Sequence, residues 1–178
     1  MKHYEMLYEH AVDNNGVVTA AAAARMGLRT SELTRFCADG RIERVGYGVY
    51  RLTHFVPTSV TPYAEAVALV GEAAFLYGES VLAMHGLAPT DPRWTRVATP
   101  ARVRRRLPGW LLVTRVPTES VAIEYEGVRS QPVADALLSC ARTMLPDRVM
   151  AAAHEAFDAG LVTAEELNVV VTELENGR

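Results

Sequence analysis

The chain has 178 residues, of which 49% are hydrophobic, and its formal net charge is −3. This length and composition predict a folded protein with one good-sized domain or two small ones, and exclude a disordered chain. The charge is unevenly distributed. Residues 93–115 hold seven arginines and no acidic residue, whereas residues 116–178 hold four basic and eleven acidic residues. The asymmetry between a basic middle and an acidic end raises the question of a charged partner.

Several protein classes are excluded by single residue types. Lys2 is the one lysine and lies outside any glycine-rich context, which excludes a P-loop or a Schiff-base site. Cys37 and Cys140 lie far apart in apolar helical patterns, so we expect reduced cysteines. The most apolar stretch, around residues 64–76, is too short to span a bilayer, and the N-terminus lacks a signal-peptide pattern. We therefore expect a cytoplasmic protein that does not contact a membrane.

The first forty residues predict three short helices separated by tight turns. Apolar residues recur at helical spacing over residues 3–14. Thr19 is an N-cap candidate for an alanine-rich helix over residues 20–26. A third helix covers about residues 30–39 and ends at a glycine.

A β-hairpin is predicted next, over residues 41–52, where apolar residues flank a Gly-Tyr-Gly centre. Three helices followed by a hairpin are the layout of a winged helix-turn-helix. Residues 53–61 resemble a linker. The sequence thus predicts an α+β protein with a winged helix-turn-helix DNA-binding domain over residues 1–55 and a second α+β domain over residues 61–178.

The second domain is predicted to be a small mixed α/β unit that ends in three helices. A helix capped by Thr61-Pro62 comes first, and another covers about residues 79–85. Strands are predicted at residues 95–98, 111–116 and 121–125, and the final helices near residues 132–144, 147–159 and 163–175. Thr163 and Glu166 form a capping-box pattern at the start of the last helix.

The third helix is the candidate DNA-reading element. Leu33, Phe36 and Cys37 are expected to pack inward. The opposite face presents small or hydrogen-bonding side chains around one arginine: Ser31, Thr34, Arg35 and Ala38. Arg35 can bond two acceptors of a guanine, and Ser31, Thr34 and the helix start at Thr30 suit phosphate or base contacts. The alternative is that Arg35 is an ordinary solvated arginine.

The predicted wing supplies four further candidate DNA contacts, Arg41, Arg44, Tyr47 and Arg51. Arginine or tyrosine on a hairpin commonly reaches the DNA backbone or the minor groove. The alternative is a solvated hairpin whose arginines pair with Glu43 and other local acids.

A second basic segment lies between two prolines, at residues 100–108. It contains four arginines within five residues: Arg102, Arg104, Arg105 and Arg106. Such a loop cannot easily bury four guanidinium groups, so we expect them to be exposed. Three uses stay open: neutralisation of DNA phosphates, docking onto the acidic C-terminal part of the same or another molecule, and a plain solvated loop.

No catalytic or cofactor pattern accompanies these features. The five histidines are scattered without metal-ligand spacing, and Gly78-Glu79-Ser80 lacks the second glycine of a nucleophile elbow. We therefore expect no catalytic residues, no metal and no cofactor, and predict that the protein is not an enzyme.

Four segments carry a resemblance to a known family. They are GVVTAAAAARMGL at residues 16–28, GRIERVGYGVYRL at 40–52, GESVLAMHGL at 78–87 and VRSQPVADALL at 128–138. In this order they resemble the AbiEi-like antitoxins of bacterial type IV toxin–antitoxin and abortive-infection systems. The third segment is the most discriminating, because the first two are shared with many winged-helix proteins.

The resemblance implies a repressor of its own operon that counteracts a nucleotidyltransferase-like toxin. Its partners would be the double-stranded DNA of its own promoter and a cognate toxin protein. Arg35, Arg41, Arg44 and Arg51 then fall in the DNA-reading unit, and residues 102–106 fall where a second contact face could lie. Glu79, Ser80 and His85 are interpreted as a packing and hydrogen-bonding element. The alternatives are a stand-alone winged-helix transcription factor and a protein-interaction module without DNA binding.

Overall fold

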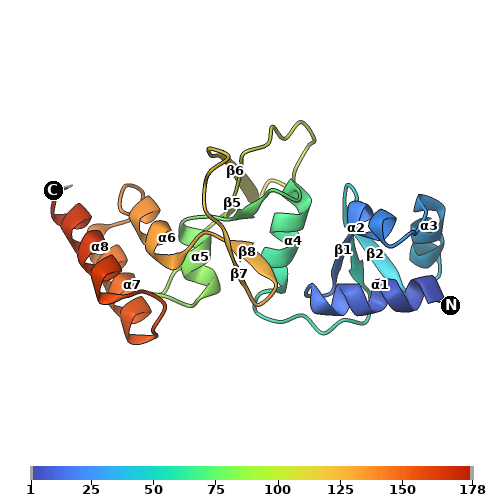
Figure 1. The fold of residues 1–178 in the computed structure, drawn as a ribbon, viewed down its shortest axis with the longest axis horizontal. Coiled ribbons are helices and arrows are strands. Elements are labelled where there is room, and N and C mark those ends of the chain that lie inside the picture. Colours follow the sequence, from blue (N-terminus) through green and yellow to red (C-terminus); the bar gives the residue numbers. More distant parts are fainter. Residues whose placement is uncertain (1, 177–178) are drawn as a thin grey trace.

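The computed structural model describes residues 2–176 and shows a mixed α+β chain, which confirms the predicted fold class. The two outermost ends of the predicted domains, residues 1 and 177–178, lie outside the described part. Figure 1 shows the helices and strands of the N-terminal part at one end of an elongated molecule and the three C-terminal helices at the other end. No helix among the described residues is long and apolar enough to cross a membrane.

The N-terminal part has the arrangement of a winged helix, as predicted. Its elements are α1 (Lys2–Asp13), β1 (Val17–Thr19), α2 (Ala20–Arg25), α3 (Thr30–Ala38), β2 (Ile42–Gly46) and β3 (Val49–Leu52). The three strands form an antiparallel sheet in the order β1-β3-β2. The Thr19 hydroxyl accepts a hydrogen bond from the Ala22 amide at 3.1 Å, so the predicted N-cap of α2 is confirmed.

A five-stranded sheet and five helices make up the rest of the described chain. The elements are α4 (Thr61–Val70), β4 (Phe75–Leu76), α5 (Glu79–Met84), β5 (Thr95–Thr99), β6 (Leu111–Arg115), β7 (Ile123–Tyr125), β8 (Val128–Ser130), α6 (Val133–Cys140), α7 (Pro146–Asp158) and α8 (Ala164–Asn176). The strand order is β6-β5-β4-β8-β7, with parallel pairs β5–β6 and β4–β8. The three final helices and the capping box of Thr163 and Glu166 are confirmed.

Four details differ from the prediction. The helix α6 ends at Cys140, four residues before its predicted end near residue 144. The strands β4 and β8 were not expected, because two or three residues are too few to show an alternating pattern. The strand β7 begins at Ile123, two residues after the predicted start. The N-cap of α4 is Val60 rather than Thr61, because the Thr61 hydroxyl accepts a hydrogen bond from the Thr58 amide at 2.9 Å and caps no helical amide.

The buried apolar residues form two clusters, one in the winged helix and a larger one around α4 and the second sheet. Val17 and Val49 lie on winged-helix strands, yet they belong to the larger cluster. The helix α4 therefore packs directly against the winged-helix sheet. Division of the chain into domains at residues 55–61 stays a prediction. Both cysteines are free, and burial raises the pKa of the Cys140 thiol to about 12.

Two glycines allow a test of the contact that closes the winged helix. Gly16 and Gly27 both have a positive φ, near +78° and +85°. A Cβ added at Gly16 would lie 2.5 Å from the Phe55 ring, whereas a Cβ at Gly27 would meet nothing within 4 Å. Gly27→Ala should cost about 1 kcal/mol of backbone strain. Gly16→Ala should cost about 2–4 kcal/mol, because Phe55 must also move.

Urea denaturation of both variants measures this difference. Equal losses of unfolding free energy would show that Phe55 moves aside freely and does not hold the segment after β3 against the α1–β1 turn.

Candidate nucleic-acid interface

The helix α3 presents the face predicted to read DNA. Leu33 and Phe36 are buried at 1% and 3% exposure, as predicted, and Cys37 is half-buried against the same cluster. Four of the predicted contact residues are exposed together on the outer face: Thr30, Ser31, Thr34 and Arg35. The Arg35 guanidinium lies 5.4 Å from the centre of the Phe36 ring. The structure thus brings these four side chains together on one helix face.

The start of α3 is fixed by its own first turn. The Glu32 carboxylate accepts a hydrogen bond from the Arg29 amide at 3.0 Å and lies 2.8 Å from His3 Nδ1. The bond from the Arg29 amide, followed by the bond to His3, lowers the pKa of Glu32 below its ordinary value. Glu32 is therefore engaged inside the winged helix, and the exposed start of α3 is left to Thr30 and Ser31.

The wing places three of its four candidate residues at the surface. Arg41 lies over the Tyr4 ring at 4.7 Å, and Arg44 Nε donates to the Gly46 carbonyl at 3.1 Å. Tyr47 stands at the hairpin tip with 73% of its surface exposed. An exposed tyrosine at the tip, Arg44 on β2 and Arg41 just before that strand fit contacts with a DNA backbone or minor groove.

Arg51 differs from the other three residues of the wing. Its guanidinium donates to the carboxylates of Glu43 and Glu65, and these bonds raise the pKa of Arg51 above its ordinary value. Glu43 lies on the neighbouring strand and Glu65 on α4. Arg51 therefore ties the hairpin to α4, and a contact of Arg51 with DNA would require breaking these ion pairs.

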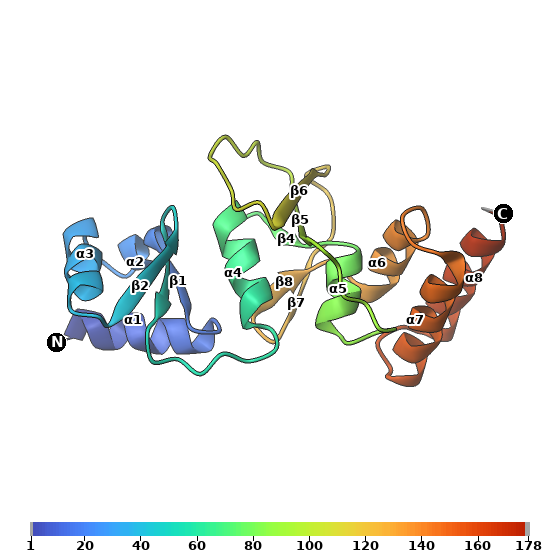
Figure 2. The same cartoon turned by 180° about the vertical axis from the view of Figure 1, so that it is seen from behind.

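The loop over residues 100–108, the arginine loop, lies beside the wing tip. A surface hollow is lined by Gly46 and Tyr47 of the wing, Leu69 of α4, and residues 105–108 of the loop. In Figures 1 and 2, α3, the hairpin tip and the arginine loop all lie along the upper side of the molecule, while α1 lies below. The loop does not dock on α7 and α8 of its own chain, because these helices lie at the far end of the molecule from the winged helix and the loop (Figure 1).

One arginine of the loop has a structural role that the sequence did not reveal. Arg105 Nε donates to the Leu69 carbonyl at 3.1 Å, and its Nη2 donates to the Val70 carbonyl at 2.6 Å. These carbonyls end α4, where backbone acceptors lack helical partners. Arg102, Arg104 and Arg106 are exposed, and within residues 2–176 they form no ion pair or hydrogen bond. All four arginines are exposed, as predicted, but Arg105 also anchors the loop through these two bonds, whereas the other three arginines have no such role.

The interpretation of Glu79, Ser80 and His85 as a packing and hydrogen-bonding element holds for the hydrogen bonding of Ser80, whereas among the described residues the Glu79 side chain and the buried His85 Nε2 form no hydrogen bond. Ser80 is fully buried, and its hydroxyl accepts a hydrogen bond from the Arg96 amide at 2.8 Å. The Gly78 amide donates to Gln131 Oε1 at 3.1 Å, which joins the segment to β8 and α6. His85 lies against Tyr125 with 4.2 Å between ring centres, and burial lowers its pKa. Among the described residues, no group of acidic, histidine or cysteine side chains could hold a metal ion.

Comparison with known proteins gives a family match for the N-terminal part. Residues 5–53 match the family described as "Transcriptional regulator, AbiEi antitoxin", which confirms the resemblance for the winged helix. The match ends just after β3. Comparison with curated proteins found no match. Among solved structures, the RV2827C protein from Mycobacterium tuberculosis is similar over 97% of this chain and 72% of that chain, at 14% identity and a TM-score of 0.48.

Arg105 and its neighbour Arg106 allow a test of whether Arg105 anchors the arginine loop to the end of α4. Arg105→Gln should lower the free energy of unfolding by about 1 kcal/mol, because two α4 carbonyls lose a charged donor. Arg106→Gln should leave it within about 0.5 kcal/mol, as expected for an exposed side chain without partners. Urea denaturation measures both. Equal stability of the two variants would contradict the anchoring role of Arg105.

Proposed function

We propose that this chain binds double-stranded DNA through one continuous basic surface and represses transcription of its own operon as an antitoxin. The surface consists of the outer face of α3, the wing, and the arginine loop. The observation that carries the proposal is the position of the arginine loop beside the wing tip, on the same side of the molecule as α3. The match of residues 5–53 to a family of transcriptional regulators supports it.

Each part of the surface suits a different contact. A helix in the major groove reads base edges through its exposed side chains, and the small residues around Arg35 allow close approach. Arg44 and Tyr47 extend from the hairpin next to it. Arg102, Arg104 and Arg106 add three charges that no acidic side chain neutralises within the described chain. The loop therefore supplies phosphate contacts that the winged helix, with seven basic and six acidic residues over residues 1–52, lacks.

If α3 reads bases, a substitution on its outer face should lower the affinity for the specific DNA sequence and not for unrelated DNA. Arg35→Ala should weaken binding to the DNA upstream of its own gene by about ten- to a hundred-fold, because one bidentate arginine contact contributes about 1–3 kcal/mol. Binding to unrelated DNA of equal length should change little. Fluorescence anisotropy on both duplexes measures the effect, with Arg142→Ala in the distant α6–α7 turn as the matched control. An equal effect of both variants would remove Arg35 from the reading surface.

Phosphate contacts by the arginine loop predict a different signature. Arg104→Ala and Arg106→Ala should each weaken binding to both duplexes and reduce the slope of log K against log salt by about 1. Titrations at four salt concentrations measure the slope. Absence of salt-sensitive DNA binding by the wild-type protein would refute the regulator proposal as a whole. Slopes unchanged in Arg104→Ala and Arg106→Ala would limit the DNA-binding surface to the winged helix.

Antitoxin activity and repression can be separated in cells. We expect co-expression of this chain to rescue cells from the toxin encoded by the adjacent gene, and a reporter under its own promoter to be repressed. Arg35→Ala should relieve repression, since the variant loses operator binding. Failure to rescue, with repression intact, would leave a stand-alone transcription factor.

A further inference from the structure

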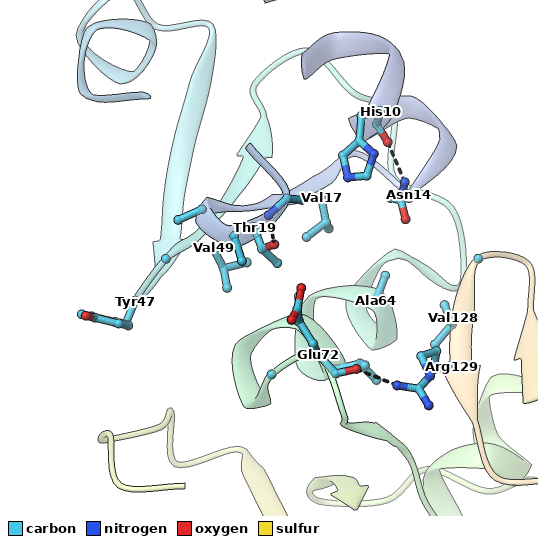
Figure 3. A pocket seen from close by; sticks show the side chains of 18 of the residues that line it. His10, Asn14, Val17, Thr19, Tyr47, Val49, Ala64, Glu72, Val128 and Arg129 are labelled. Atoms are coloured by element: carbon cyan, nitrogen blue, oxygen red, sulfur yellow. Dashed lines mark hydrogen bonds between the residues drawn. The ribbon is translucent and has the colours of Figure 1, made fainter. Parts of the chain in front are cut away.

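A cleft of about 570 Å³ is lined by the winged helix on one side and by α4 and the β7–β8 turn on the other, beside the contact where α4 packs against the winged-helix sheet (Figure 3). One wall comes from the end of α1, β1, α2 and the hairpin tip. The opposite wall comes from α4, the residues that follow it, and the β7–β8 turn. The volume lies within the range of small-molecule sites, about 300–1,000 Å³, and such sites often lie where two structural units meet.

The walls of the cleft are mainly apolar. Figure 3 shows Val17 and Val49 on the winged-helix side, with Ala64 and Val128 across the cleft. Val67 of α4 adds to the same surface. Val17, Val49 and Val128 are themselves almost fully buried. The apolar surface open to a ligand comes from the small or branched side chains that are partly exposed, Ala20, Ala64, Val67 and Ala68, and these favour the hydrocarbon or ring part of a ligand.

The charged groups of the cleft are mostly positive. Arg25, Arg105 and Arg129 line it, and Glu72 is the one acidic side chain among the lining residues. Arg25 forms an ion pair with Glu72, and Arg129 Nη1 donates to the Glu72 backbone carbonyl at 2.6 Å. Since a guanidinium carries five N–H groups, Arg25 and Arg129 keep donors for a further acceptor. The combination of an apolar wall and excess arginine is complementary to an anion with an apolar body.

We propose that this cleft binds a small amphipathic organic anion, a carboxylate or sulfonate with an aliphatic or aromatic body. We propose further that the bound anion lowers the affinity for DNA, an inference that rests on the proposed function.

The same residues connect the cleft to the DNA-binding surface. Tyr47 and Gly48 at the hairpin tip both line the cleft, and Tyr47 also lines the hollow beside the arginine loop (Figure 3). Arg105 lines the cleft and anchors the arginine loop. An anion held there places negative charge beside two parts of the surface that would meet phosphates. By linkage, DNA lowers the affinity for the anion by the same factor that the anion lowers the affinity for DNA.

The site is tested without DNA, using 8-anilino-1-naphthalenesulfonate as the probe on the full chain. We expect saturable binding of one probe per chain. The fluorescence of the directly excited probe measures this binding. Octanoate should displace the probe and octylammonium should not, because the arginines select the charge while both competitors share the same body. Equal displacement by the two competitors would overturn the anion assignment.

Two pairs of variants locate the binding. Ala21→Trp should block the cleft, whereas Ala24→Trp on the same helix lies outside it. Arg129→Gln should weaken probe binding about ten-fold, the effect of losing one charged hydrogen bond, whereas Arg115→Gln on β6 should not. Near-ultraviolet circular dichroism checks that each variant is folded. If Ala21→Trp unfolds the protein, the comparison of Arg129→Gln with Arg115→Gln locates the binding site. Probe binding unchanged in Arg129→Gln would overturn the site.

Coupling to DNA is then measured on the operator duplex. Octanoate at saturation should weaken DNA binding about ten-fold in the wild type and leave Arg129→Gln less affected. DNA binding unaffected by octanoate would overturn the regulatory half of the proposal, with the site intact. A chain that binds the probe but no DNA would refute the proposed function and not the cleft.

Discussion

The packing of α4 against the winged-helix sheet determines how the two ends of the candidate surface are placed. Val17 and Val49 of the sheet are buried in the cluster around α4, and each such valine contributes about 1.5–3 kcal/mol when it leaves water. The Arg51–Glu65 ion pair joins the same elements at the edge. Both valines are covered, so the second part of the chain cannot move independently of the wing without exposing apolar surface.

Arg105 attaches the arginine loop to the end of α4, so the packing of α4 against the winged helix also determines where the loop lies. It donates to the last carbonyls of α4, and the hairpin tip lies against Leu69 in the same turn of the helix. Helix C-termini attract cations because of the unpaired carbonyls and the helix dipole. One arginine thus holds the loop, and Arg106 next to it lines the same hollow as Tyr47. Four arginines that look equivalent in sequence therefore have two different roles.

The sequence predicted the parts of the structure that depend on local spacing. The helices α1 to α3, the cap at Thr19 and the hairpin tip follow from patterns within a few residues. The pairing of Arg51 with Glu43 is one of the two alternatives that the sequence leaves open for the wing, and that partner lies only 8 residues away. The bonds from Arg51 to Glu65 and from Arg105 to the end of α4 have no local signal, because those partners lie 14 and about 35 residues away. The short strands β4 and β8 carry no periodic signal of their own.

The cleft could not be predicted from the sequence for a different reason. Its lining comes from at least six separate segments, and each of them has an ordinary composition. Its origin is the small side chains that face each other where a packed interface would need large ones. Ala20, Ala21 and Ala68 cannot fill the space between α2 and α4, although protein interiors are close-packed. Polar contacts at its margins join the two walls: Arg25 pairs with Glu72, and the Asn15 side-chain Nδ2 donates to the Glu126 carbonyl at 2.8 Å. A molecule in the cleft would therefore complete the packing at the same contact that sets the arginine loop beside the wing.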